Sequence, residues 1–209
     1  VPFLEPFVAI PYLAARTEKL RFTTSVIKLA IRQPVIVAKQ LATLGVMLGD
    51  RFGFGVGISP WPEDFLACQI PWEQRGKRMD EMMEIVNGLM SGEYFGYDGE
   101  IFQLDPIKLC PVPDHHIPLL VGGHAKPALR RAARLGDGWI SAGSSLEELQ
   151  AMIGQIEDFR KDFGRDQGAF EYHAMTEAAY STQGLDQLTA AGVTEVIIAF
   201  RNPYDAQPD

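Results

Sequence analysis

The sequence predicts an α/β fold in which parallel strands alternate with helical crossovers. Along most of the 209 residues, stretches with helical spacing of apolar side chains take turns with short β-rich stretches. Parallel neighbours can be joined only through a crossover of about a dozen residues or more, and segments of that length separate the predicted strands. Prolines near helix starts and glycines near helix ends mark the boundaries, so the pattern predicts six strands and six helices.

The predicted elements follow a regular order. In the first half they are a helix over 6–20, a strand over 21–31, a helix from Pro34, a strand over 51–58 and a methionine-rich helix closed near Gly92. In the second half they are a strand over 117–123, a helix over 127–136, a strand over 137–143, a helix opened by the capping-box pair Ser145 and Glu148, a strand over 170–175, a helix closed at Gly192 and a strand over 193–200.

One segment, 92–117, breaks this order. Asp98-Gly99 lies between aromatic residues and is a hairpin signal, so we interpret 92–117 as an insertion. No internal repeat, low-complexity tract or linker is present, and we expect residues 1–209 to form a single domain.

Composition excludes several classes of protein. With a net charge of −8, a pI near 5.0 and no cluster of Lys and Arg, the chain does not fit a nucleic-acid-binding protein. No apolar run approaches the roughly 20 residues that a membrane helix needs. Cys68 and Cys110 are too far apart for a redox or zinc motif, and we expect two reduced thiols in a cytoplasmic protein.

The stretch "RFGFGVGISPWPEDF" places glycines at alternate positions of a predicted strand. It matches neither G-x-G-x-x-G nor a P-loop, because Ile58 and Pro60 stand where a third glycine would be needed and no Gly-Lys-Ser/Thr follows. Two interpretations remain. The glycines either keep a crowded barrel strand thin, or let a flat ligand lie against bare backbone at the strand end.

Several stretches together resemble the luciferase-like monooxygenase superfamily. They are "TTSVIKLAIRQPVIVAKQLATL", "RFGFGVGISPWPEDF", "RGKRMDEMMEIVNGLM", "IPLLVGGHAKPALRRAARLGDGW" and "GVTEVIIAF". The likeness covers nearly the whole chain in order, and is closer to the branch that depends on the deazaflavin coenzyme F420 than to the FMN-dependent branch.

The resemblance implies a (β/α)8 TIM barrel of the bacterial luciferase-like type, with its site at the C-terminal ends of the strands. Six strands are visible where eight are required, and the chain begins with Val. We therefore expect the first two strands and the final helix to be missing from this sequence. The family also implies a homodimer that acts on a small-molecule substrate.

The resemblance further implies which residues bind the cofactor. The peptide bond Ser25-Val26 matches a cis bond that forms a bulge behind the deazaflavin ring. Gly55, Gly57 and Ile58 match the strand end beside the ring, where a side chain larger than hydrogen would occupy the ligand's space.

The phosphate half of the cofactor is expected over the next strand ends. Gly122, Gly123 and His124 precede a helix N-terminus, and Ser141, Ala142 and Gly143 end the following strand. Without the resemblance, these are two ordinary strand-to-helix turns. His124 either contacts phosphate or faces solvent.

The remaining polar residues have simpler interpretations. Glu63 and Asp64 fit solvated residues of a first helical turn better than catalysts. Asp114, His115 and His116 fit a solvated loop with no bound metal, His173 fits a core residue, and Met79, Met82, Met83 and Met90 fit core filling. No catalytic residue can be named.

The function that follows is hydride transfer between coenzyme F420 and a small organic substrate. The alternatives are an FMN-dependent luciferase-like monooxygenase and a non-catalytic flavin-binding protein. The substrate is not indicated by the sequence.

Overall fold

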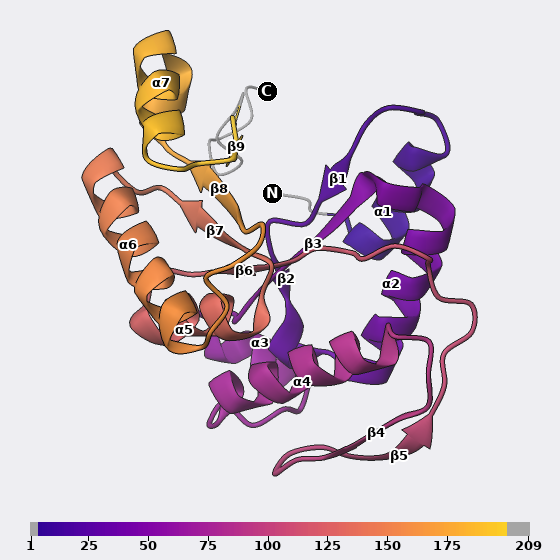
Figure 1. Ribbon diagram of the computed structural model, residues 1–209. Helices are drawn as coiled ribbons and strands as arrows, with labels where there is room; N and C mark the ends of the chain where they lie inside the picture. Colours follow the sequence, from indigo (N-terminus) through magenta and orange to yellow (C-terminus); the bar gives the residue numbers. More distant parts are fainter. Residues whose placement is uncertain (1–3, 200–209) are drawn as a thin grey trace. The chain divides into compact units, whose positions relative to one another are not determined.

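The computed structural model describes residues 4–199 (Figure 1). The end of the strand predicted over 193–200 and the chain after it therefore lie outside the described residues. The described chain forms two compact units, a first unit of Pro6–Gly122 and a second unit of residues 4–5 and 123–199. Within residues 4–199, no helix combines the length and the apolar character needed to cross a membrane.

The first unit contains a parallel sheet and the helices that cover it. Its elements are α1 (Pro6–Ala14), β1 (Phe22–Thr23), β2 (Ile27–Lys28), η1 (Leu29–Ile31), α2 (Pro34–Leu48), η2 (Gly49–Arg51), β3 (Phe52–Gly57), α3 (Pro62–Ala67), α4 (Arg75–Leu89), β4 (Phe95–Asp98), β5 (Gln103–Ile107) and β6 (Leu119–Gly122). Strand β3 is central, because β1, β2 and β6 all pair with it in parallel. The helix that opens at Pro34 has the predicted proline in its first turn.

The core of this unit lies between the sheet and its helices. Phe52, Phe54 and Val56 alternate along β3 and are buried. Helix α2 buries the predicted apolar face, which includes Val37, Leu41 and Leu44, and it packs against α4. On α4, Met79, Met82 and Met83 are fully buried, which confirms their interpretation as core residues.

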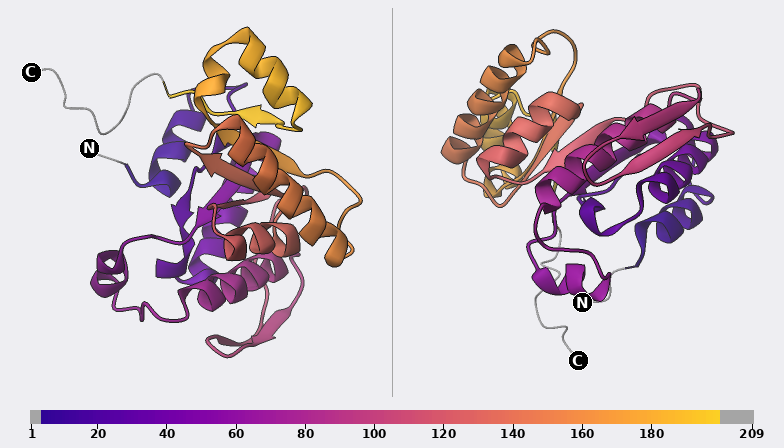
Figure 2. Two further views of the ribbon diagram at one scale, coloured as in Figure 1. Left: turned by 90° about the vertical axis from the view of Figure 1, so that its left-hand side faces the viewer. Right: turned by 90° about the horizontal axis from the view of Figure 1, so that it is seen from below.

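A hairpin formed by β4 and β5 lies beside α4 (Figures 1 and 2). The two strands are antiparallel, as the Asp98-Gly99 signal predicts. The Glu81 carboxylate on α4 accepts hydrogen bonds from the backbone N–H groups of Glu100, Ile101 and Phe102 at 3.0 to 3.3 Å. Glu81 is buried, so these bonds fix the turn of the hairpin to the helix.

The second unit repeats the strand–helix pattern. Its elements are α5 (Lys126–Leu135), β7 (Gly138–Ala142), α6 (Leu146–Asp162), β8 (Glu171–Met175), η3 (Glu177–Tyr180), α7 (Thr182–Ala190) and β9 (Glu195–Val196). Strand β8 pairs in parallel with β7 and β9, and α5 packs against α6. The capping box is present, because the Glu148 N–H donates to Ser145 Oγ and the Ser145 N–H donates to Glu148 Oε2.

Three predictions about elements in the first unit need correction. The strand predicted over 21–31 is two short strands followed by a 3-10 turn, because a bulge interrupts the pairing after Thr23. The first helix ends at Ala14 and not near Leu20, since Arg16 closes a tighter turn by donating its N–H to Leu13 O. Helix α3 is not among the six predicted helices, although the assignment of Glu63 and Asp64 to a first helical turn already implies a helix start at Pro62.

Candidate functional site

The bulge of the first unit lies at the predicted ring-binding position. Phe22 and Thr23 pair with Phe52 and Gly53, and pairing resumes at Ile27 with Val56. The three residues 24–26 between β1 and β2 therefore lie opposite only two residues, 54 and 55, of β3. Thr24 bridges the gap, because its Oγ1 accepts from the Gly55 N–H and donates to Gly55 O, both at 2.8 Å. The Ser25-Val26 peptide bond is cis, as the family resemblance predicts. Both residues are exposed, so the bulge offers an open edge.

Val26 changes the interpretation of the glycines. A methyl group on Gly57 would lie 2.6 Å from Cγ2 of Val26, and one on Gly122 would lie 2.8 Å from its Cγ1. The space beside these glycines is therefore filled by Val26 and not kept open for a ligand, which corrects the argument made from the sequence. Val26 itself is 38% exposed and presents its outer side to solvent.

The other predicted residues of this strand end have separate surroundings. Gly55 is buried, and both its N–H and its carbonyl are bonded to Thr24. Ile58 directly follows β3 and is partly exposed. The structure thus brings Val26, Gly57 and Gly122 together. Gly55 stabilises the bulge through its two backbone hydrogen bonds to the Thr24 hydroxyl.

A polar cluster at the same strand end was not found from the sequence. Lys28, the last residue of β2, pairs in register with Gly57, and its Nζ lies 2.5 Å from Asp64 Oδ2. Ser59 Oγ also donates to Asp64. The hydrogen bond from Lys28 has the larger effect and that from Ser59 the smaller, and both lower the pKa of Asp64 below its usual value. Asp64 is in a first helical turn as predicted, but it is ion-paired and only 27% exposed, so its description as a solvated residue needs correction.

The second unit brings two of the predicted phosphate residues, His124 and Ser141, into a hydrogen-bonded chain with Ser144, which was not predicted. His124 Nε2 lies 3.2 Å from Ser141 Oγ, and Ser141 Oγ lies 2.8 Å from Ser144 Oγ. The indole of Trp139 donates to Gly123 O at 2.8 Å and packs edge-on against the His124 ring. His124 is therefore exposed to solvent, while its ring is held by Ser141 and Trp139.

The backbone amides at the end of β7 already have hydrogen-bond acceptors within this unit. The Ala142 N–H donates to His124 Nε2 at 3.2 Å, and the Gly143 N–H donates to Met175 O at 2.8 Å. Because Nε2 accepts from this amide, a neutral His124 carries its proton on Nδ1. Gly123 and Gly143 have φ values of +121° and +74°, so both turns need glycine.

The two helices that follow differ in how their N-termini are satisfied. Helix α6 satisfies its own first turn through the capping box. Helix α5 has Ala125 at its N-cap, which gives no side-chain hydrogen bond. A hollow of about 380 Å³ in this unit is lined by His124, Gly143, Ser144 and Glu148. The hydroxyls, the imidazole and the uncapped α5 terminus are donors of the kind that bind a phosphate.

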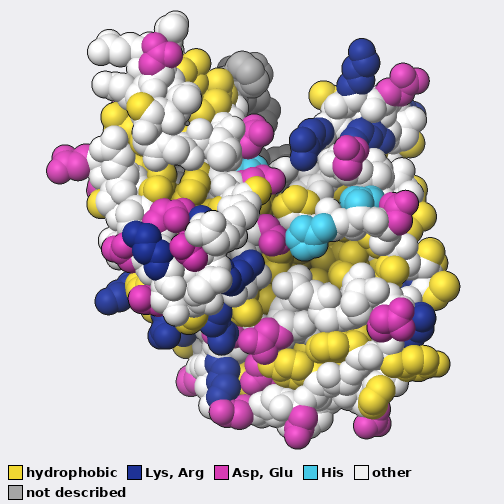
Figure 3. Space-filling model, viewed as in Figure 1, with side chains coloured by type: hydrophobic (Ala, Val, Ile, Leu, Met, Phe, Trp, Pro, Cys, Tyr) yellow, Lys and Arg dark blue, Asp and Glu magenta, His cyan; other side chains and the backbone are white. Residues whose placement is uncertain are grey.

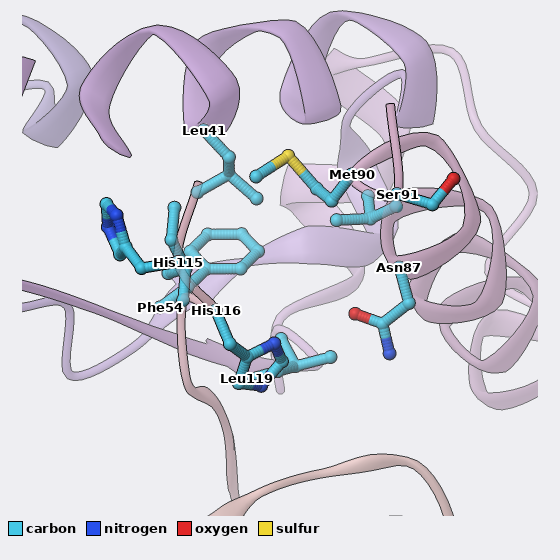
Figure 4. A pocket seen from close by; sticks show the side chains of 10 residues that line it. Leu41, Phe54, Asn87, Met90, Ser91, His115, His116 and Leu119 are labelled. Carbon is cyan, nitrogen blue, oxygen red and sulfur yellow. The ribbon is translucent and has the colours of Figure 1, made fainter. Parts of the chain in front are cut away.

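A second cavity lies in the first unit, away from the strand ends described above. Its volume is about 300 Å³, and it is lined from α2, α4, the middle of β3 and the loop that holds His115 and His116 (Figure 4). Hydrophobic side chains line this hollow between α2 and α4 (Figure 3). Among residues 4–199, no group of three or more His, Cys, Asp or Glu side chains is placed to hold a metal ion. His173 is buried on β8, with Nε2 2.7 Å from Glu171 Oε2, which confirms it as a hydrogen-bonded core residue.

Comparison with known families identifies the origin of this architecture. The model of the luciferase-like monooxygenase family matches residues 2–184. The chain belongs to the luciferase-like monooxygenase family. The parallel strands and their helices are accordingly part of a luciferase-like TIM barrel, and the predicted fold class is confirmed.

Relatives within this family have diverse names. The chain is 45% identical over its whole length to the uncharacterised protein Rv0940c of Mycobacterium tuberculosis, of which it spans 72%. Over 80% of the chain it is 31% identical to the pyrimidine monooxygenase RutA of Allorhizobium ampelinum, and over 75% it is 29% identical to an F420-dependent glucose-6-phosphate dehydrogenase of Microbacterium testaceum. It spans about half of each of these two relatives, 48% and 49%.

A solved structure supports the same fold. The coenzyme F420 dependent tetrahydromethanopterin reductase of Methanopyrus kandleri superposes with a TM-score of 0.78 at 15% identity. The match covers 92% of this chain and 81% of that structure.

Proposed function

We propose that this protein is an oxidoreductase that transfers a hydride between coenzyme F420 and a small organic substrate. The observation that carries the proposal is the bulge at Thr24–Val26. Its exposed edge stands at the C-terminal end of a parallel sheet, where barrels of this kind carry their sites. The F420-dependent relative, at 29% identity, supports the deazaflavin as the cofactor.

The chain's own residues would bind and orient the coenzyme. Ser25 and Val26 would lie behind the ring, and Ile58 beside it. His124, Ser141, Ser144 and the uncapped α5 terminus would hold a phosphate. The coenzyme supplies the hydride chemistry when bound, while the protein excludes water and fixes the geometry.

A second candidate is an FMN-dependent monooxygenase, which the 31% identity to RutA favours. The two candidates differ in their use of oxygen. We expect substrate-dependent oxidation of reduced F420 in the absence of oxygen, and no substrate-dependent oxygen uptake with reduced FMN. The opposite pattern would assign the monooxygenase reaction. Binding of either cofactor without turnover of any substrate would favour a non-catalytic flavin-binding protein.

We also propose that the protein is a cytoplasmic homodimer. Cys68 and Cys110 are both free thiols, which suits a reducing compartment. Helices α1 and α2 pack together and leave several large apolar side chains exposed. These are Val8, Tyr12, Leu13, Ile36, Val46 and Met47. Such a face is of the kind that a second copy of the chain covers.

A further inference from the structure

Lys28 occupies a defined place beside the proposed ring position. It follows Val26 by two residues, and it pairs in register with Gly57 at the end of β3. Its ammonium lies 2.5 Å from Asp64 Oδ2 and 4.6 Å from the centre of the Trp61 ring. Carboxylate and indole thus fix the end of a side chain that is otherwise flexible.

The Asp64 carboxylate, which binds Lys28, is itself fixed by a hydrogen bond from Ser59. Ser59, which is 1% exposed, donates its hydroxyl to Asp64 Oδ2, and its Oγ accepts from the backbone N–H of Trp61 at 3.2 Å. Asp64 therefore stays ionised at neutral pH and keeps one orientation. The loop after β3 and the end of β2 are joined through these four residues.

The ammonium retains capacity for one more partner. It carries three N–H donors, and with the described residues it forms one hydrogen-bonded ion pair, to Asp64, and one cation–π contact, to Trp61. The Lys28 side chain is 39% exposed and Trp61 is 52% exposed, so a small molecule can reach both. Because Asp64 already balances the charge of Lys28, a neutral oxygen acceptor suits this place better than a second carboxylate.

We propose that Lys28 binds the oxygen of a neutral carbonyl substrate, an aldehyde or ketone, with Trp61 as the apolar wall and Asp64 and Ser59 as positioning residues. This inference rests on the proposed function and names its substrate class. Reduction of the carbonyl group adds a hydride to carbon and a proton to oxygen. When bound, reduced F420 would supply the hydride, and the proton that its two-electron oxidation releases would pass to solvent. The Lys28 ammonium would donate a proton to the carbonyl oxygen, and solvent would reprotonate the amine.

The first test measures binding without coenzyme or turnover. The indole N–H signal of Trp61, assigned with Trp61→Phe, is followed by NMR during titration with acetone, cyclohexanone, benzaldehyde and 2-cyclohexenone. We expect at least one probe to shift this signal saturably. Lys28→Met should weaken the Kd of that probe about tenfold, as expected for loss of a hydrogen bond from a charged donor. In Lys28→Arg, the Kd of that probe should stay within about threefold of the wild-type value.

A matched control separates this role from general loss of charge. Lys77 on α4 is also ion-paired, to Glu100, and is 40% exposed. Lys77→Met should leave the Kd of every probe unchanged. Unchanged probe binding in Lys28→Met, or no saturable shift of Trp61 with any of the four probes in the wild type, would overturn the proposal.

The second test separates this proposal from the proposed function. With F420 bound, hydride transfer to the binding probe should slow about 100-fold in Lys28→Met, while the Kd for F420 changes less than about twofold. A wild-type protein that fails to bind F420, yet loses probe binding in Lys28→Met, would refute the proposed function and leave the carbonyl subsite standing. A hydride-transfer rate unchanged by Lys28→Met would refute the catalytic part of the inference.

Discussion

Val26 and the two glycines beneath it show how single residues shape the strand ends of the first unit. The alternating glycines in "RFGFGVGI" predict a close approach, and the structure contains one. The partner in this approach is a side chain of the same chain, which lies 31 residues before Gly57. Such a contact cannot be predicted from local spacing, because it depends on the register of two strands and on the bulge between them.

Substitution of Gly57 by Ala should destabilise the fold. The new methyl group would meet Val26 Cγ2, and overpacking of this kind costs about 1–3 kcal/mol in the free energy of unfolding. Val26→Ala in the same chain should relieve most of that cost. Urea unfolding of both single variants and the double variant gives the coupling free energy between the two positions. Strictly additive changes in the free energy of unfolding would contradict the contact.

The Lys28–Asp64 pair should make stability depend on pH. The pKa of Asp64 is lowered in the folded protein, so the pair stabilises the fold above the ordinary value of 3.8, and this contribution is lost as the pH falls through the lowered pKa. Asp64→Asn should therefore cost about 1 kcal/mol at pH 7. The difference from the wild type should shrink as acid unfolding is followed below pH 4, whereas a constant difference would mean that Asp64 acts other than through its charge.

At the scale of elements, the features predicted best are those that local sequence specifies. The capping box at Ser145, the proline start of α2 and the Asp98-Gly99 hairpin each depend on residues a few positions apart. The bulge could be predicted only from the family resemblance, since nothing in the local sequence around Ser25-Val26 distinguishes this segment from an ordinary strand. The Glu81 anchor was missed because its partners lie about 20 residues further along the chain.

The anchor predicts a local effect of Glu81→Ala. Removing the carboxylate leaves the N–H groups of Glu100, Ile101 and Phe102 without their acceptor, at a cost of about 1–3 kcal/mol. Hydrogen exchange at these three amides should accelerate strongly. Glu84→Ala, which removes the acceptor of the Tyr97 hydroxyl, is the control and should leave their exchange nearly unchanged. Equal exchange rates in both variants would contradict the anchor.

At the scale of the whole molecule, the sequence predicts the fold class correctly because strand–helix alternation limits the possible architectures. The candidate site is predicted less completely. Glycine turns at 123 and 143 are visible in the sequence, but the hydrogen bond from the Ala142 amide to His124 joins residues 18 positions apart and has no local signal. The ion pair of Lys28 with Asp64 likewise joins residues 36 positions apart.

The exposed apolar face of α1 and α2 predicts self-association. Sedimentation velocity of the purified protein should give a dimer at micromolar concentration. Val8→Glu combined with Met47→Glu should shift it toward the monomer, because charges on a covered apolar face lose their hydration. A wild type that sediments as a monomer at all concentrations would exclude the homodimer.

The central claim is that the protein binds F420 as its redox cofactor, and a fluorescence titration with oxidised F420 and with FMN tests it most directly. We expect a lower Kd for F420 than for FMN. His124→Ala should weaken F420 binding about tenfold through the phosphate, while Lys161→Met, at an exposed ion pair on α6, should have no effect. A lower Kd for FMN, together with substrate-dependent oxygen uptake, would contradict the account and identify the protein as a flavin monooxygenase.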